Sequence, residues 1–434
     1  MSNETMMCRH DLNTIEGISL GKLYSQNGEN KNDIDALSNN LNIKTKLWRH
    51  KDNSYSIIRY DKSMLSKDRW PTIGLLRSVI AKDKKVLCFS PPKSISYDNF
   101  KQTAIPESIV ANEYVEGTMI NMFYTGSEWE IATRSSVGGN VSFYAASDGT
   151  PTKTFRWMFL DAVSHCETLS EDPRDLFSCV ETFPKTYCFS FILQHPDNRI
   201  VVPFQNPNVY LAKIYNIQSN YVEEVPITNE VTQLLPVWLC YPQNVNKEYQ
   251  WLEYCFRDGC ETDYKIVGAM LSGRDSNNNV IRTKIRNPNY ESVRQLRGNQ
   301  PKLQYRYLML RKARKVADYL KYYPEHRTLF DSYRKLIHKF TKELHTNYIM
   351  CYVKKSGPLN TFSPQYRTHM FKLHEEYKTN LSSQQKVVTR NVVIDYVNNL
   401  HPNLLMHACN YHYKQAKKEM AAVQSSNDVS MEDE

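Results

Sequence analysis

The sequence lacks the features that would place it in a membrane, on a secretory route or at a structural metal site. No run of apolar residues approaches the about 18 that a membrane span needs. The N-terminus is polar and has no apolar signal core, so we expect no secretory route. The ten cysteines form no CxxC pair, and the closest two, Cys255 and Cys260, have no histidine nearby, so we expect reduced thiols and no metal site. The histidines have no HExxH-like spacing, and we interpret them as packing or surface residues.

What is present indicates a folded protein of more than one domain. A chain of 434 residues is too long for one small core and predicts two or three domains. The apolar share of 41% and the aromatic share of 12% are typical of folded rather than disordered chains.

Positive charge is confined to one segment. Residues 1–300 carry 33 Lys and Arg against 34 Asp and Glu, and residues 381–434 carry 5 against 6. Residues 301–380, by contrast, carry 17 against 6. Localised basic charge points to nucleic acid, while the alternative interpretation is a solvated helical face.

The stretch from Glu113 to Gly139 predicts an interior β-hairpin. Its first strand, around residues 118–124, is apolar on both faces, and a turn at 125–127 leads to a second strand at 129–133. Glu116 and Gly117 open the hairpin, where glycine permits close approach of a ligand or a kink. Arg134 follows it, before two serines and a double glycine. An ordinary hairpin with a flexible exit is the alternative.

Two further stretches read as antiparallel strands. Residues 187–215 predict a meander with a turn at 195–198, a return strand at 200–204 and a third strand at 209–215. Residues 264–299 predict two strands joined by a polar loop, and period-two alternation places Arg282, Lys284 and Arg286 on one face. Three cations on one face indicate either an anion site or a charged, solvent-facing edge strand. Residues 153–163 predict a helix behind the sheet.

Beyond residue 301 the apolar residues recur at helical spacing. One helix is expected from Tyr305 to Leu320, and a second carries the apolar stripe Leu329, Tyr333, Leu336, Ile337, Phe340 and Leu344. A third begins at Ser363 and Pro364, and a fourth spans about 387–400. We expect residues 1–30 to form a flexible arm and residues 421–434 a disordered acidic tail.

The basic residues of these helices are the predicted nucleic-acid contacts. On the first helix Arg311, Arg314 and Lys315 can share one face. On the second, the cations opposite the apolar stripe are Arg334, Lys335, Lys339 and Lys342. Tyr322 and Tyr323, at the connection, are predicted to stack on bases of a single strand.

The order and spacing of the three sheet-forming stretches resemble the covalent nucleotidyltransferase superfamily of ligases and capping enzymes, most closely the bacteriophage RNA ligase 1 type. The residues around Glu116-Gly117-Thr118 are similar to its first motif, FSFILQHPDNRIV at 189–201 to its third, IVGAML at 266–271 to its fourth, and Lys284-Ile285-Arg286 to its fifth. The resemblance implies an α+β domain of antiparallel sheets with flanking helices over residues 31–300, followed by an all-α basic domain over 301–420. It further implies nucleotide- and phosphate-binding roles for a set of residues: Arg77, Lys93, Glu116, Gly117, Arg134, Lys284 and Arg286.

The sequence departs from the family at the positions that carry its chemistry. A lysine three residues before the motif glycine forms the covalent nucleotide adduct in the family, and here that position is Tyr114. The carboxylates of the third and fourth motifs are replaced by Ser190 and Val267. We expect Tyr114, Ser190, Val267 and Lys284 to converge on one pocket between two antiparallel sheets.

We therefore interpret the chain as an RNA-ligase-like protein that binds RNA or another nucleic acid and has lost covalent catalysis. One alternative is an active ATP-dependent RNA ligase with a relocated nucleophile, for which Lys93 is the candidate and ATP and Mg²⁺ would be the cofactors. Another is a viral assembly protein that keeps the fold as a scaffold. Similar chains occur in large DNA viruses, so we expect a viral source, a place in the host cytoplasm or virion, no resident metal and no membrane partner.

Overall fold

The structure is a computed structural model, and it describes residues 8–24, 31–143, 153–167, 180–245, 248–416 and 419. The described residues cluster into two compact units, one up to residue 294 and one from residue 295. The division lies six residues before the change of charge in the sequence. Among the described residues, no helix is long and apolar enough to span a membrane.

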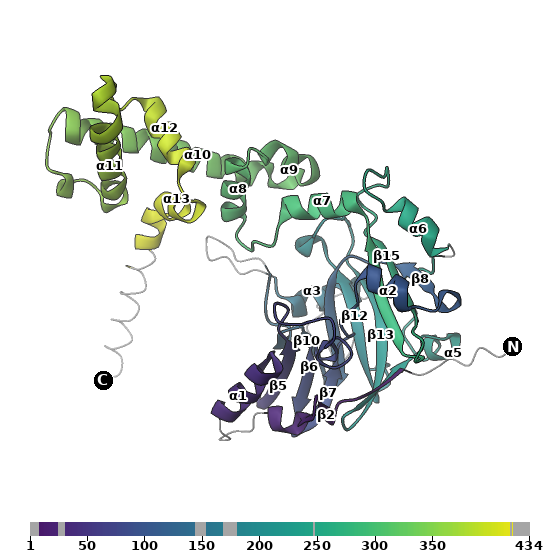
Figure 1. The fold of residues 1–434 in the computed structure, drawn as a ribbon. Helices are drawn as coiled ribbons and strands as arrows, with labels where there is room; N and C mark the ends of the chain where they lie inside the picture. Colours follow the sequence, from purple (N-terminus) through teal and green to yellow (C-terminus); the bar gives the residue numbers. More distant parts are fainter. Residues whose placement is uncertain are drawn as a thin grey trace, which may run out of the picture. The chain divides into compact units, whose positions relative to one another are not determined.

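The first unit is built from antiparallel sheets (Figure 1). A four-stranded sheet has the order β4 (Ile43–His50), β5 (Asn53–Tyr60), β6 (Val79–Lys82) and β7 (Lys85–Phe89). A seven-stranded sheet has the order β1 (Cys8–Asp11), β14 (Tyr221–Val225), β13 (Asn208–Gln218), β12 (Tyr187–Gln194), β9 (Thr118–Tyr124), β10 (Trp129–Thr133) and β11 (Ser136–Val137). A three-stranded sheet has the order β16 (Val280–Arg286), β15 (Gly268–Arg274) and β8 (Val110–Glu113), and β2 (Thr14–Ile15) pairs with β3 (Ile18–Ser19).

The hairpin of β9 and β10 lies at the centre of this unit. Asn121 and Phe123 face the four-stranded sheet, whereas Ile120 and Met122 pack in the core formed with α3 (Phe155–Glu167). Every residue of β10 is buried. Because the strands are covered on both sides, they are apolar on both faces. The prediction of an interior hairpin with a helix behind the sheet is confirmed.

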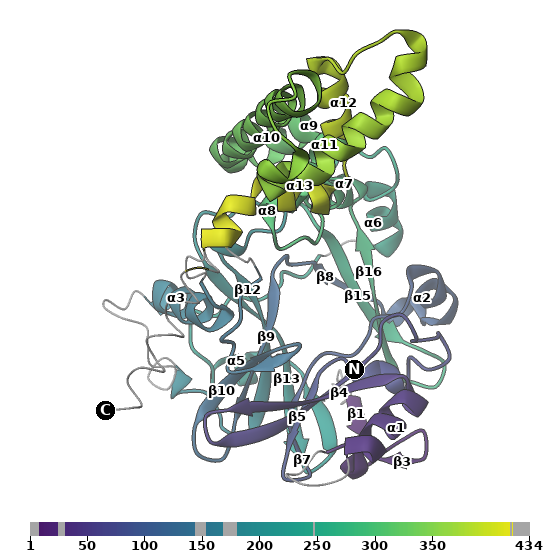
Figure 2. The ribbon, with the colours of Figure 1, turned by 90° about the vertical axis from the view of Figure 1, so that its left-hand side faces the viewer.

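The three-stranded sheet has its own small core. Thr283 and Ile285 of β16 are buried on the side that α2 (Tyr97–Thr103) and α6 (Tyr249–Cys255) cover. Figure 2 shows both helices along this sheet. The alternate residues of β16, Arg282, Lys284 and Arg286, therefore face the other way.

Two predictions for the first unit are wrong. Residues 8–24 are no loose arm, because β1 pairs with β14 and Leu12, Leu20 and Leu23 are fully buried in the core. Residues 200–204 form no strand, because the Val201 and Val202 amides donate to a buried carboxylate, that of Glu116. β13 pairs directly with β12 instead.

Helices make up the second unit. They are α8 (Leu303–Lys312), α9 (Val316–Tyr322), α10 (Arg327–Tyr348), α11 (Pro364–Glu376), α12 (Arg390–Asn399) and α13 (Pro402–Cys409), preceded by α7 (Pro288–Arg297). The long α10 packs against α8, α11, α12 and α13. π-helical turns follow α10 at Ile349–Val353 and α11 at Tyr377–Leu381.

The helical pattern was predicted only in part. The expected single helix from Tyr305 to Leu320 is broken at Arg314, which has a left-handed backbone with φ of 57°. Leu329 and Leu336 are 38% and 39% exposed, so they lie outside the buried stripe of α10, which Phe330 and Tyr348 join. The predicted tail at 421–434 lies outside the described residues.

Candidate nucleotide and nucleic-acid site

Tyr114 to Gly117 form the connection between two sheets. β8 of the three-stranded sheet ends at Glu113, and β9 of the seven-stranded sheet begins at Thr118. The Tyr114 amide donates to the Gly268 carbonyl of β15 at 3.3 Å. At the other end, a Cβ on Gly117 would lie 2.5 Å from the Leu193 carbonyl oxygen, so only glycine allows this approach to β12. The connection is therefore held at both ends.

Glu116 anchors the loop that follows β12. Its carboxylate accepts hydrogen bonds from the Val201 amide at 2.9 Å and the Val202 amide at 3.1 Å. Burial raises the pKa of Glu116, although these amides and the Tyr290 hydroxyl oppose the rise. Its oxygens are already occupied by donors of the chain, so Glu116 holds the loop that follows β12.

The Tyr114 ring lies among the cations of β16. The Arg286 Nη2 donates to the Tyr114 hydroxyl at 3.3 Å, and the Arg286 guanidinium lies 5.7 Å from the ring centroid. The Lys284 Nζ lies 5.9 Å from the same centroid. Burial alone raises the pKa of Tyr114, but Lys284, Arg286 and Arg77 outweigh it and the pKa is lowered. The expected convergence of Tyr114 and Lys284 is confirmed.

Cations from other segments act on the same place. Burial lowers the pKa of Lys93, and Lys284 and Arg77 lower it further. The Lys93 Nζ donates to the Ser94 carbonyl at 2.7 Å and lies 5.0 Å from the Trp70 ring centroid. Burial also lowers the pKa of Arg77. Arg134 and Arg282 lower it further, whereas Tyr60 raises it.

Together these residues form what we call the cation cluster: Arg77, Lys93, Arg134, Arg282, Lys284 and Arg286. Arg134 is exposed and donates from Nε to the Arg77 carbonyl at 3.4 Å. Arg282 donates to the Pro92 carbonyl at 3.2 Å. Among the described residues, the cluster takes part in one ion pair, between Arg286 Nη1 and Glu291 Oε1 at 2.5 Å. The cluster is thus under-neutralised and suited to a phosphate-bearing anion.

Ser190 and Val267, where the resemblance implies carboxylates, make contacts of their own. The Ser190 hydroxyl donates to Asn121 Oδ1 at 2.8 Å, and Asn121 Nδ2 donates to Ser90 Oγ at 2.6 Å, all in the interior. Val267 is buried and its carbonyl accepts from the Asn287 amide at 3.0 Å. Ser190 is thus bonded across the β12–β9 pair, and its convergence with Tyr114 and Lys284 stays a prediction.

The donor set fits phosphate and not a divalent metal. No group of three or more His, Cys, Asp or Glu side chains that could hold a metal occurs in the part of the chain that the structure describes. Mg²⁺ prefers carboxylate oxygens, whereas the residues around Tyr114 are chiefly Arg and Lys. Sequence reasoning had not singled out Asn121, Trp70 or Glu291; Asn121 was detectable as a polar residue inside an apolar strand.

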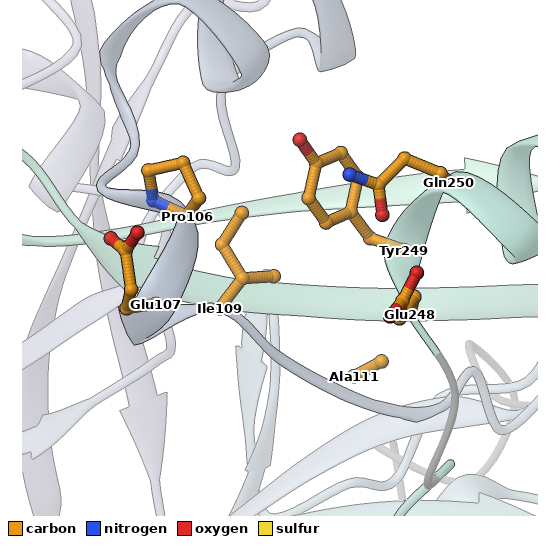
Figure 3. Close-up of a pocket in the computed structure, with 7 residues that line it drawn as sticks. All are labelled: Pro106, Glu107, Ile109, Ala111, Glu248, Tyr249 and Gln250. Carbon is orange, nitrogen blue, oxygen red and sulfur yellow. The ribbon is translucent and has the colours of Figure 1, made fainter.

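The depression in Figure 3 is a different feature. It has a volume of about 310 Å³ and is lined by Pro106, Glu107, Ile109, Ala111, Glu248, Tyr249 and Gln250. It holds two carboxylates and none of the cation cluster, so its charge does not suit a phosphate.

The predicted nucleic-acid contacts of the second unit are only partly on one surface. Arg311 donates to Asn398 of α12, and Arg314 lies in the break between α8 and α9, so the predicted shared face with Lys315 does not exist. Arg334 and Lys335 both contact Asp331 while Lys339 is exposed. Tyr323 is only 2% exposed and stacks with Tyr319, which rules out base stacking on it.

A curated protein supports the resemblance. The chain is 26% identical over 212 residues to an RNA ligase of Rhodothermus phage RM378. The chain resembles a bacteriophage RNA ligase. The match covers 43% of this chain and 45% of the relative, so it spans less than half the length of that ligase. No protein-family model matches the chain.

Solved ligase structures are also similar, at low scores. A putative ATP-dependent DNA ligase from Aquifex aeolicus gives a TM-score of 0.35 at 10% identity, covering 80% of this chain and 79% of that one. An archaeal ATP-dependent RNA ligase gives 0.37 at 11% identity, covering 71% of each chain. The α+β class with antiparallel sheets and a helical C-terminal region stands on the strands and helices described above.

We predict that Tyr114 titrates below an ordinary tyrosine and that Lys284 is a main cause. In NMR spectra of protein labelled with ¹³C at tyrosine Cζ, the resonance that disappears in Tyr114→Phe should titrate with a midpoint below the usual value of about 10. Lys284→Met should raise that midpoint, because the cation that favours the phenolate is lost. Lys101→Met is the control, since Lys101 contacts Glu253. An unchanged midpoint in Lys284→Met would contradict the assignment.

The lowered pKa of Tyr114 also makes the stability of the fold depend on pH. Because the folded pKa of Tyr114 is depressed, its ionisation stabilises the fold above the ordinary tyrosine pKa, and this contribution is lost as the pH falls through the folded value. The wild type should therefore gain stability over Tyr114→Phe as the pH rises from neutral towards about 10.

Proposed function

We propose that this protein is an RNA-ligase-like protein that binds nucleic acid and has lost the covalent nucleotidyl-lysine step. The similarity to a phage RNA ligase supports the ligase-like fold and the nucleic-acid partner. That relative is a phage protein, which also supports our expectation of a viral source.

The observation that carries the proposal is Tyr114 at the place of the lysine, bonded to Arg286 and surrounded by cations. A phenol has no amine with which to form a phosphoramidate. Losing the lysine alone would leave motif carboxylates buried without their counter-charge, at a cost of several kcal/mol. With Ser190 and Val267 in place of carboxylates, the interior stays satisfied, as the Ser190–Asn121–Ser90 bonds show.

The cations to which the family resemblance gives phosphate-binding roles are present in this chain. Besides burial, Lys284 and Arg77 lower the pKa of Lys93, and Arg286 and Arg77 lower the pKa of Lys284, which means that a bound anion would relieve their repulsion. We propose that the cation cluster binds a phosphate group of a nucleotide or a nucleic-acid end without a metal ion.

The second candidate is an active ATP-dependent ligase that uses Lys93. One observation favours it: the pKa of Lys93 is lowered, chiefly by burial, so a larger share of its amine is uncharged and nucleophilic. Against it, the Lys93 Nζ is engaged by the Ser94 carbonyl and the Trp70 ring.

Covalent labelling separates the two candidates. We expect no labelled protein band after incubation with α-labelled ATP or GTP and Mg²⁺ and denaturing electrophoresis, with an active ATP-dependent ligase in parallel as the positive control. A labelled band would overturn the loss of catalysis. Lys93→Ala and Tyr114→Phe would then identify the nucleophile, since only the variant that lacks it loses the band.

A further inference from the structure

An aromatic ladder lies where α10 and α11 end in the second unit. This aromatic ladder consists of Tyr348, Tyr352, His374 and Tyr377. The rings of Tyr352 and His374 stack with centroids 3.9 Å apart and planes 13° apart. His374 and Tyr377 continue the stack at 5.9 Å and 20°, and Tyr348 adjoins Tyr352 at 5.3 Å.

The backbone around the ladder is unusual at two places. Both helices widen into a π-helical turn here, at Ile349–Val353 after α10 and at Tyr377–Leu381 after α11. The Lys354 amide donates to the Ile349 carbonyl at 2.9 Å and the Ser382 amide to the Tyr377 carbonyl, each five residues back. π-helical turns are rare and are found frequently at functional sites.

The aromatic ladder is partly exposed to solvent. Tyr348 is buried, but Tyr352, His374 and Tyr377 are only half-buried. Beside them Val353 is 62% exposed and Phe371 is 50% exposed. Burial and Lys378 lower the pKa of His374, so its ring stays uncharged at neutral pH and stacks as an aromatic.

The charge next to the ladder is positive. Lys354, Lys355 and Lys378 are exposed, and no ion pair involves them among the residues that the structure describes. Tyr377 and Lys378 follow His374 by three and four residues, so they lie on its side of α11, whereas Glu376, two residues on, does not. Half-exposed aromatic rings flanked by unpaired lysines suit a ligand with flat bases and a phosphate backbone.

We infer that the aromatic ladder is a stacking site for the bases of single-stranded nucleic acid, with Lys354, Lys355 and Lys378 beside its phosphates. The inference rests on the proposed nucleic-acid binding and assigns it a site in the second unit, made of residues other than the cation cluster. Arg334 is an exposed cation of α10, and 18 residues of helix, about 27 Å at 1.5 Å per residue, separate it from Tyr352. One strand can therefore follow α10 to the ladder. Duplex bases are already stacked and paired, so they cannot use it.

The test uses the full chain and a single-stranded RNA of about ten nucleotides that carries one 2-aminopurine, placed at each position in turn. We expect the fluorescence at one or two positions to be quenched on binding, and Tyr377→Ala and Tyr352→Ala to abolish the quenching. Each variant should bind roughly 10-fold more weakly with an unchanged salt dependence, because no charge is removed. Tyr377→Phe, which keeps the ring, should behave like the wild type.

The outcomes separate this inference from the proposed function. Unchanged affinity and quenching in a folded Tyr377→Ala protein that still binds the RNA would overturn the ladder and leave the proposed function standing. Absence of any binding by the wild type would overturn both. Equal affinity for a duplex of the same length would also contradict a stacking site. Tyr377 is half-buried, so a loss of the unit's far-UV circular dichroism in Tyr377→Ala would move the test to Lys378→Glu and Lys354→Glu, which should weaken binding.

Discussion

Replacing Gly268 by alanine is expected to destabilise the first unit by about 3 to 5 kcal/mol, the sum of backbone strain and a clash that no rotamer relieves. Gly268 has φ of 138°, and a Cβ there would lie 2.0 Å from the Ile285 carbonyl oxygen. The obstacle is backbone, so β15 and β16 would have to separate. The measurement is denaturant unfolding followed by tryptophan fluorescence, which reports this unit because all six tryptophans precede residue 295.

Two other glycines separate the effect of backbone strain from the effect of the clash. Gly126 also has a positive φ, of 100°, but its Cβ would meet nothing within 4 Å, so Gly126→Ala should cost only about 1 kcal/mol. Gly117 has no positive φ, but its Cβ would lie 2.5 Å from the Leu193 carbonyl oxygen, so Gly117→Ala tests the clash alone. If Gly268→Ala were no worse than Gly126→Ala, the close pairing of Gly268 with Arg286 would be wrong.

This glycine also matters for the site. Gly268 pairs with Arg286, and the residue that its Cβ would strike lies between Lys284 and Arg286. The tight pairing therefore sets where the two cations sit relative to Tyr114, whose amide bonds to the Gly268 carbonyl. The residue before Gly268 is Val267, the position at which the family resemblance implies a carboxylate.

Local periodicity predicted the parts of the fold that depend on nearby residues. The hairpin of β9 and β10 and the pair β15 and β16 follow from apolar runs and turns. The shared face of Arg282, Lys284 and Arg286 follows from the two-residue repeat of a strand. The loop at 200–204 could not be predicted this way, because what holds it is Glu116, more than eighty residues earlier in the chain.

The residues of the candidate site also divide into those that the local sequence marks and those that it does not. Arg77 and Lys93 were predicted only through the family resemblance, and the hairpin marked Arg134 only as the residue that follows it. Nothing in the nearby sequence marks these three residues as neighbours of Lys284. Their mutual influence arises from sheet packing, which a single sequence does not encode locally. The contact of Ser190 also could not be predicted from nearby residues, because Ser190 lies on β12 and its partner Asn121 lies on a strand 69 residues away.

Charge also could not reveal the helix break at Arg314. A run of Arg311, Lys312, Arg314 and Lys315 looks continuous in sequence, yet the left-handed Arg314 separates α8 from α9. The exposed cations of α10 are the better candidates for a backbone-binding surface, because one uninterrupted helix presents them. We define this cation stripe as Arg334, Lys335, Lys339 and Lys342, all of them exposed.

Reversing the charge of the cation stripe is expected to abolish most nucleic-acid binding. The variant Arg334→Glu, Lys335→Glu, Lys339→Glu and Lys342→Glu removes four cations and adds four anions on the solvent side of α10. If each cation neutralises one phosphate, the slope of log affinity against log salt should fall by about 3 to 4, and the affinity at low salt by at least about 100-fold. Asp331 already contacts Arg334 and Lys335, so these two should contribute less than Lys339 and Lys342.

The matched control changes the net charge by the same amount elsewhere. Lys22, Lys67, Lys84 and Lys85 are exposed lysines of the first unit, outside the cation cluster, and their replacement by glutamate should leave most of the affinity intact. Binding is measured by fluorescence anisotropy with a 5′-labelled RNA at several salt concentrations. If both variants lose affinity equally, net charge and not the cation stripe is responsible. If neither variant changes the affinity or the salt slope, the stripe only solubilises the helices. A wild type that binds no nucleic acid at any salt concentration would favour a scaffold role for the fold.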